Sequence, residues 1–417
     1  MSGAEDRMTA RRSPFTQRNF RFQWPADLAT SLGFEMETLI LGWYVLVSTE
    51  SVVWLTAFGA LQFTGTLLGP LLGVAGDRIG QRTLLAAMRL SYLVVASCVG
   101  ALAVTENLSP VAVLVAAALL GLVRPSDIGV RNTLVAAIMP PEMLAGALGI
   151  SRASMDGARV LGALAGAGII AALGIGAAYG VVVALYLAAT LLTLAVREPQ
   201  RAGPKAAPAT ALGVWRELAE GVAHTRGTPV LMAALWLAWL TNFAAYPLSG
   251  GLLPHVAREV YGMDRAGLGL LAASFAGGAL AGSMILSLRG VGRRPAQLML
   301  GAAAIWFGLL LIYAQVRTAA AGMPLLFAAG LVQSFCMIPM SVLLLRSTEV
   351  AFRGRVMGLR MLCIYGLPLG LLAAGYGIAQ VGFAATATLY ACFGLAATAA
   401  IAWHWRGSLW RGPGAKG

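Results

Sequence analysis

Two trios of charged residues interrupt long apolar stretches of this 417-residue chain, and each trio has an aspartate between two arginines. They are Arg124, Asp127 and Arg131, spaced i, i+3 and i+7, and Arg152, Asp156 and Arg159, spaced i, i+4 and i+7. In a helix, each spacing places the three side chains on one face. A short loop at 140–143 joins the two stretches, which predicts antiparallel helices whose trios match in depth. We expect the trios to interdigitate into a buried ion-pair network, with each aspartate facing an arginine of the other helix.

Three more acidic residues, Asp27, Glu35 and Glu37, lie in the apolar stretch 24–48. Together with the trios they make five carboxylates against four guanidinium groups, so one carboxylate is left without a partner. A buried carboxylate without a partner takes up a proton, which is the property that a proton-coupled carrier needs. The candidates for this role are Glu37 first and Glu35 second, followed by Asp27 and Asp127. A fixed ion-pair scaffold is the alternative interpretation of the trios.

The composition decides which elements position these groups. Hydrophobic residues make up 59% of the chain and charged residues only 11%, whereas a soluble protein has roughly a quarter charged residues. The mean hydropathy is +0.77. These values exclude a soluble enzyme, a disordered chain and a nucleic-acid-binding domain, despite the net charge of +13. The four cysteines lie in apolar runs without metal-type spacing, so we expect no disulfide framework, metal site or cofactor. The chain is predicted to cross the lipid bilayer many times.

A helix that spans the hydrocarbon core needs about 20 mostly apolar residues, and charge clusters and Gly/Pro breaks divide the chain into about twelve such runs. The predicted fold class is an all-α membrane protein with twelve transmembrane helices in two pseudo-symmetric six-helix halves. The predicted organisation is an N-terminal tail at 1–23, the first half at 24–196, a linker at 197–227, the second half at 228–405 and a C-terminal tail at 406–417. The linker stretch 211–226 is predicted to form an amphipathic helix on the membrane surface, with a solvated turn as the alternative.

The basic residues predict the orientation. Of the 30 lysines and arginines, 21 fall in the two tails, the linker and the loops on their side of the membrane, and three fall in the opposite loops. Positively charged loops stay in the cytoplasm. We therefore expect both termini and the linker to be cytoplasmic, in a membrane of the bacterial inner-membrane type.

The chain also resembles itself at about half its length. GDRIGQR at 76–82 follows the second apolar run and RGVGRR at 289–294 follows the eighth, while PPEMLAGALG at 140–149 has a counterpart in VAFRGRVMG at 350–358. Internal repeats of this kind are typical of secondary transporters, whose substrate site lies near the midplane between the halves.

Residues 73–82 read GVAGDRIGQR, which resembles the loop 2–3 signature of the major facilitator superfamily. The matching residues are Gly73, Asp77, Arg78, Gly80 and Arg82. The resemblance implies a gating loop, in which Asp77 and the arginines form an ion-pair latch linked to the side on which the cavity opens. A loop that only sets the topology is the alternative. Gln81 replaces the basic residue that the signature usually carries.

A narrower resemblance rests on NFRFQW at 19–24, SLGFEMETLILGW at 31–43, SDIGVRNTLVAAIMPPEMLAGALG at 126–149 and RGRVMGLR at 353–360. These segments are similar to the enterobactin-exporter-like branch, whose members export siderophores and drugs. The chain departs from that branch at Phe34, where an aspartate is usual, and at Gly129, where a proline is usual. The missing proline weakens the expectation of a kinked antiporter gate.

The second half offers uncharged polar and aromatic groups that would suit the wall of a substrate cavity. The candidates are Trp236, Trp239, Asn242 and Tyr246, expected on one broad helix face, with Gln333, Phe335 and Met337 on the tenth run. Helix packing and an interfacial aromatic belt are the alternative explanation.

We compare three functions. The resemblance favours a proton-coupled secondary exporter of a small amphiphilic compound, either a siderophore-like metabolite or a drug. A facilitator, importer or flippase of a lysolipid or small metabolite on the same fold is the second. A membrane enzyme or sensor is the weakest, because the sequence has no nucleotide motif or metal-ligand cluster. The expected partners are a small-molecule substrate, protons and lipid, without nucleic acid, and a monomer is the simplest state.

Overall fold

The computed structural model describes residues 13–68, 72, 75–76, 78–197, 211–292, 294–349 and 352–410. All regular elements in these ranges are helices. In the long apolar helices the backbone polar groups are bonded within the helix, which is the requirement for crossing a bilayer.

The first half contains one long helix, several shorter ones and a pair of consecutive helices, α8, that are joined at a break. Its elements are η1 (Pro14–Thr16), α2 (Arg18–Thr49), α3 (Val52–Leu61), η2 (Thr64–Leu68), α5 (Gln81–Val104), α6 (Pro110–Gly121), α7 (Arg124–Ile138) and α8 (Pro141–Ala195). Gly174 inside α8 has φ 81° and ψ 177°, a conformation that only glycine adopts readily. The two helices of α8 meet there.

The second half follows the linker helix α9 (Ala211–Arg226). Its elements are α10 (Pro229–Leu240), the π-helical segments η3 (Thr241–Ala245), η4 (Pro247–Gly251) and η5 (Val256–Val260), α11 (Leu253–His255), α12 (Arg265–Arg289), α13 (Pro295–Tyr313), α14 (Ala319–Arg346), α15 (Arg353–Leu362), η7 (Cys363–Tyr365), α16 (Gly366–His404) and α17 (Arg406–Leu409). Gly382 in α16 (φ 82°) breaks that helix as Gly174 breaks α8.

Eight helical stretches in the described part of the chain are long and apolar enough to cross a membrane. Two of them, Pro141–Ala195 and Arg353–His404, contain the breaks at Gly174 and Gly382 and are long enough to cross twice. The charged helix α2 and the stretch that begins with α3 complete the predicted twelve. The fold class is confirmed, whereas the boundaries of the halves and the linker stay predictions.

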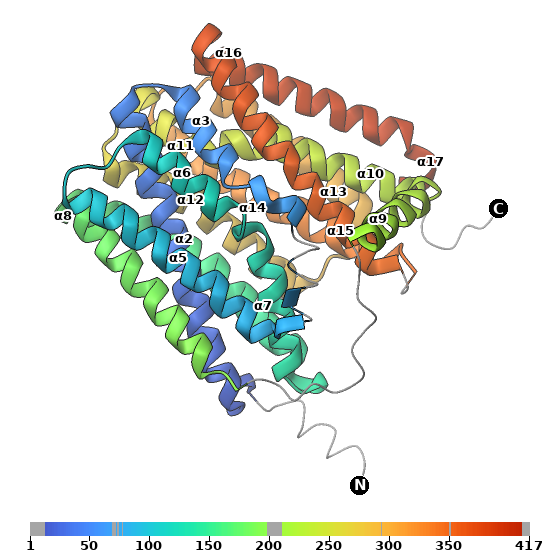
Figure 1. Ribbon diagram of the computed structural model, residues 1–417. Coiled ribbons are helices and arrows are strands. Elements are labelled where there is room, and N and C mark those ends of the chain that lie inside the picture. Colours follow the sequence, from blue (N-terminus) through green and yellow to red (C-terminus); the bar gives the residue numbers. More distant parts are fainter. Residues whose placement is uncertain are drawn as a thin grey trace.

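The halves meet at one end of the molecule and separate toward the other (Figure 1). Near α3 and α11 the helices of both halves converge. Toward the end at which α2 begins and α16 ends, α2, α5 and α8 diverge from α10, α13 and α16. At the closed end, Arg258 donates to the Leu46 carbonyl (3.1 Å) and pairs with Glu50 (3.6 Å). Gly375 of α16 leaves no room for a side chain beside Thr56 of α3.

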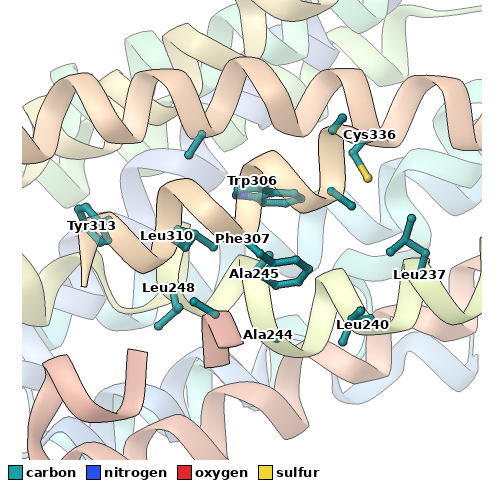
Figure 2. Packing of buried hydrophobic residues seen from close by; sticks show 14 of the residues in the cluster. Leu237, Leu240, Ala244, Ala245, Leu248, Trp306, Phe307, Leu310, Tyr313 and Cys336 are labelled. Carbon is teal, nitrogen blue, oxygen red and sulfur yellow. The ribbon is translucent and has the colours of Figure 1, made fainter. Parts of the chain in front are cut away.

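Two apolar clusters form the core of the described residues. In the larger one, Trp306, Phe307 and Leu310 of α13 lie beside the segment that carries Leu237 and Leu248 (Figure 2). Five first-half residues, Leu39, Trp43, Val52, Ala163 and Ala167, belong to the same cluster, so the two halves share apolar packing. The second cluster lies in the first half, around α2, α5 and the second part of α8.

The linker helix α9 packs against α15. Glu220 pairs with Arg355 (3.3 Å), and the ring of His224 stacks on Phe352 with centroids 4.3 Å apart. The expected apolar face of this helix, Leu212, Trp215 and Leu218, lies outside the side chains that the structure describes. The residues that are described place α9 on the start of α15.

Candidate functional site

A buried cluster surrounds Asp27 on α2. Its carboxylate accepts hydrogen bonds from Gln23 (2.7 Å) and from the guanidinium of Arg89 on α5, and it lies 3.3 Å from Arg131 Nε on α7. Arg131 also pairs with Asp127, four residues earlier on the same helix. The four charged side chains are at most 5% exposed. Two carboxylates and two guanidinium groups therefore neutralise one another here.

Glu37 lies in a second closed cluster. Its carboxylate pairs with Arg124 and accepts hydrogen bonds from the hydroxyls of Tyr186 (2.9 Å) and Tyr179 (3.3 Å). The guanidinium of Arg124 also lies over the ring of Phe34, 4.3 Å from its centroid. Glu37 is 1% exposed. Its charge is fully compensated and shut off from water.

Glu35 has different surroundings. Its Oε1 lies 3.5 Å from Arg159 Nε on α8, and Arg159 also lies 3.6 Å from Asp156. Arg152 completes the group, 3.4 Å from Asp156. Glu35 is 38% exposed, Arg159 41% and Arg152 60%. Charged side chains inside a span face a water-filled space rather than lipid, because lipid exposure is costly. This group is therefore accessible to water, and Tyr246 of the second half lies within electrostatic range of Arg159.

The predicted interdigitation of the two trios is wrong. Each aspartate pairs with arginines of its own helix, because i, i+3 and i, i+4 neighbours are within reach. The partners on other helices come mainly from α2. Glu37 pairs with Arg124, Asp27 with Arg131 and Glu35 with Arg159. The second trio is also not uniformly buried, since its two arginines are open to solvent.

The sequence analysis missed the part played by Arg89. It lies alone in the apolar run of α5, is fully buried, and bonds to Asp27 and to Thr193 Oγ1. With Arg89 included, five arginines match the five carboxylates. The argument that one carboxylate must lack a partner therefore fails, although the individual carboxylates still differ in their access to water.

Arg360 on α15 is a second residue to which the sequence analysis gave no role. Among the described residues it makes neither an ion pair nor a hydrogen bond. It lies within electrostatic range of Tyr246, Arg152, Cys363 and Cys336, and it is half-buried. It lies in the segment RGRVMGLR at 353–360, which entered the sequence analysis only through the family resemblance. Five of the arginines discussed here pair with the five carboxylates, and Arg360 is the one for which the described residues offer no carboxylate.

The candidates in the second half separate into two groups. Tyr246 accepts a hydrogen bond from Gln333 (2.8 Å) and lies within electrostatic range of Arg159. Trp239 instead stacks on Phe243, which stacks on Tyr390 of α16.

Trp236, Trp239, Asn242 and Tyr246 are nevertheless among the less buried residues of this span, whereas Ala238, Leu240, Ala244 and Ala245 are buried, so their common face stays a prediction. The π-helical turns from Thr241 onward change the rotation per residue along it. Trp236 is half exposed, and Asn242 bonds to the carbonyl of Ala238 in its own helix. Phe335 and Met337 pack partly buried against the apolar core.

Two residues of the loop signature, Gly73 and Asp77, lie outside the described residues. Gly80 has φ 94°, which a glycine accommodates. Arg82 donates to the carbonyl of Leu194 at the end of α8, so it closes a helix terminus of the same half. Arg78 is exposed.

No group of three or more His, Cys, Asp or Glu side chains that could hold a metal ion occurs in the part of the chain that the structure describes. The arrangement offers charge, hydrogen bonds and a carboxylate with access to water.

Comparison with known proteins gives one family and one fold. The family model of the Major Facilitator Superfamily matches residues 14–368. A search of the curated proteins finds no match. Among solved structures, a POT family transporter in complex with a thioalcohol-conjugated peptide superposes with a TM-score of 0.74 at 11% identity, over 94% of this chain and 97% of that chain.

Two further structures are similar over most of their length. A bacterial homologue of the human lysosomal transporter Spinster, in an inward-facing and unoccupied conformation, has a TM-score of 0.68 at 14% identity and covers 94% of this chain and 96% of that chain. The E. coli fucose:proton symporter has a TM-score of 0.61 at 16% identity, with 93% and 98% covered. At these identities the likeness shows the fold alone.

Proposed function

The chain belongs to the Major Facilitator Superfamily, and from that membership we propose that it is a proton-coupled exporter of a small amphiphilic compound, working by alternating access. The substrate is a siderophore-like metabolite or a drug, as the resemblance to the enterobactin-exporter-like branch suggests. We further propose a monomer in an inner membrane of the bacterial type, with both termini in the cytoplasm. The loop at 73–82 is proposed as the gate on the cytoplasmic side.

The observation that carries this proposal is the ion pair between Glu35 and Arg159. Of the five carboxylates, Asp27, Glu37, Asp127 and Asp156 are at most 6% exposed and paired, whereas Glu35 is 38% exposed. A coupling group must exchange its proton with water on each side in turn. Glu35 meets that requirement better than Glu37.

Protonation of Glu35 would remove one of the contacts that hold α2 to α8. With Glu35 ionised, Arg159 is shared between Glu35 and Asp156. With Glu35 neutral, Arg159 keeps Asp156 alone and is available to other groups. The proton occupancy of one carboxylate thus changes the charge presented to a substrate between the halves, which is how proton and substrate movement become linked.

The halves diverge toward the end at which α2 begins and α16 ends, and the proposed orientation has this end facing the cytoplasm. An exporter in this state receives its substrate from the cytoplasm. Tyr246 and Gln333 provide polar contacts on the second-half side, across from Arg159.

The alternative is a facilitator, importer or flippase of a lysolipid or small metabolite. One similar solved structure is a fucose:proton symporter, and a symporter would use the same carboxylate with the opposite sign of coupling. The resemblance of the segments quoted above favours export over this alternative.

Everted membrane vesicles that hold an acid-inside gradient, followed with a pH dye, test the proposal. Siderophores, lipophilic cations, lysolipids and sugars are added singly to vesicles with the unmodified protein or Glu35→Gln. We expect one class to collapse the gradient only with the unmodified protein. Movement of labelled compounds without any proton movement would replace proton exchange by facilitation.

A further inference from the structure

The charge balance between the halves points to the substrate. Each of the five carboxylates near the site is matched by an arginine, and Arg360 remains. A guanidinium that is half-buried, as that of Arg360 is, loses part of its hydration, and a partner of opposite charge compensates this cost. Within the described residues no carboxylate lies within ion-pair distance of Arg360.

Arg152 makes the need for a partner stronger. Its guanidinium is within electrostatic range of Arg360, and it comes from the other half of the molecule, on α8. Two like charges repel, and the repulsion grows where water is scarce. Asp156 is shared between Arg152 and Arg159, and Glu35 also pairs with Arg159, so the two carboxylates of this group balance its two arginines and neither is left over for Arg360.

Tyr246 adds a neutral donor to the same place. Its oxygen accepts the hydrogen bond from Gln333, and its own hydroxyl hydrogen has no acceptor among the described residues. It lies within electrostatic range of both Arg159 and Arg360. The other titratable groups within electrostatic range of Arg360 are the thiols of Cys336 and Cys363.

We infer that Arg360, with Arg152 and the hydroxyl of Tyr246, forms an anion-binding site between the halves, and that the substrate carries a carboxylate or phosphate group on an apolar body. A guanidinium binds either group through charge-assisted hydrogen bonds. The inference rests on the proposed transport function and specifies the charge of its substrate. Arg360 and Arg152 belong to different halves, so a bound anion would also draw the two halves together.

The test is a binding measurement on the purified full-length protein in neutral detergent. Three fluorescent probes share one aromatic body and differ in charge: dansylglycine (anionic), dansylglycine amide (neutral) and dansylcadaverine (cationic). Since a hydrogen bond to a charged group contributes about 1.5–3 kcal/mol, we expect dansylglycine to bind roughly 10- to 100-fold more tightly than the amide. Arg360→Gln should remove this preference and Arg360→Lys should keep part of it.

Arg289→Gln is the matched control, because Arg289 is an exposed arginine at the end of α12. It should leave the preference unchanged. Competition separates the two sources of the anion: 1-oleoyl lysophosphatidate displaces the probe if a lipid phosphate fits, and monooleoylglycerol should not. If only soluble carboxylates compete, the substrate is a free metabolite.

Equal affinity for the three probes, tighter binding of the cation, or an undiminished preference in Arg360→Gln would each overturn the anion site. So would the absence of binding by every probe and by lysophosphatidate. The measurement needs no gradient and no transport. Anion binding without proton movement in vesicles would therefore refute the exchange mechanism alone, and proton-coupled movement of cations only would refute the anion site alone.

Discussion

Glu35 and Arg159 form an ion pair of 3.5 Å between α2 and α8, and both side chains keep about two-fifths of their surface open to solvent. Every other carboxylate of the first-half network that we describe is at most 6% exposed. A pair with this exposure can lose and regain its proton without unfolding the protein. The access of Glu35 to water, more than the number of charges, distinguishes a carboxylate that can exchange protons from carboxylates that only stabilise the fold.

Glu35→Gln should make transport independent of pH, because the substitution keeps the shape of the side chain and removes its titration. The measurement is the rate of substrate uptake into everted vesicles at several external pH values. Glu37→Gln is the companion variant. If Glu37→Gln flattens the pH profile with folding intact, and Glu35→Gln does not, Glu37 is the coupling group.

Asp27→Asn should destabilise the protein strongly. Breaking a buried ion pair by removing one partner costs about 3–5 kcal/mol, and Asp27 compensates both Arg89 and Arg131. The apparent melting temperature in detergent should fall clearly below that of the unmodified protein. Arg360→Gln should leave the apparent melting temperature unchanged or raise it, because the substitution removes a charge that has no ion-pair partner among the described residues. A lower melting temperature for Arg360→Gln would show that an unrecognised group of the protein compensates Arg360.

Gly375→Val should hold the molecule open at the end that is closed here. A side chain at Gly375 would collide with Thr56 of the other half, and separation of the halves relieves the collision. Overpacking costs about 1–3 kcal/mol, so the closed population should fall roughly 5- to 150-fold. Gly301→Val is the control, since no atom lies within 4 Å of a Cβ at Gly301.

Spin labels report that change. Cysteines placed at Asn107 and Arg317, exposed loop positions in the two halves, carry the labels after Cys98 and Cys392 are replaced by serine. The label–label distance should lengthen in Gly375→Val and stay the same in Gly301→Val. An unchanged distribution in both variants would mean that this contact does not control the opening of that end.

Asp77→Asn should slow transport while insertion and folding stay largely intact, if the loop at 73–82 acts as the latch that its resemblance implies. Arg82→Ala separates latch from packing, because Arg82 bonds to the end of α8 and its loss should mainly lower stability. Turnover of Asp77→Asn equal to that of the unmodified protein would remove the latch from the mechanism.

The fold could be predicted from the sequence because the requirement for about 20 apolar residues per span is local. The positions of ionisable residues within spans were equally visible. Their partners were not, because spacing along one helix says nothing of which helix lies beside it. The trios matched each other in depth, but α2 supplies the carboxylates that face Arg124, Arg131 and Arg159.

Two arginines show a second limit. Arg89 and Arg360 each stand in an apolar or amphipathic run without an acidic neighbour at helical spacing, so no pairing rule selects them. The partners of the seventh-span residues were hidden for a different reason, since the π-helical turns from Thr241 to Val260 change the rotation per residue. Only the three-dimensional arrangement reveals these features.

The unmatched guanidinium of Arg360 has an electrical consequence. In an empty carrier the substrate site has one surplus positive charge, so a negative cytoplasm favours the state in which this site faces inward. With a monoanion bound, the site is neutral. Each charge moved is worth about 2.3 kcal/mol per 100 mV of membrane potential. Return of the empty protein, and hence release of an anion outward, would be accelerated by the voltage itself, so the cell's resting potential would power the cycle even where no pH difference exists.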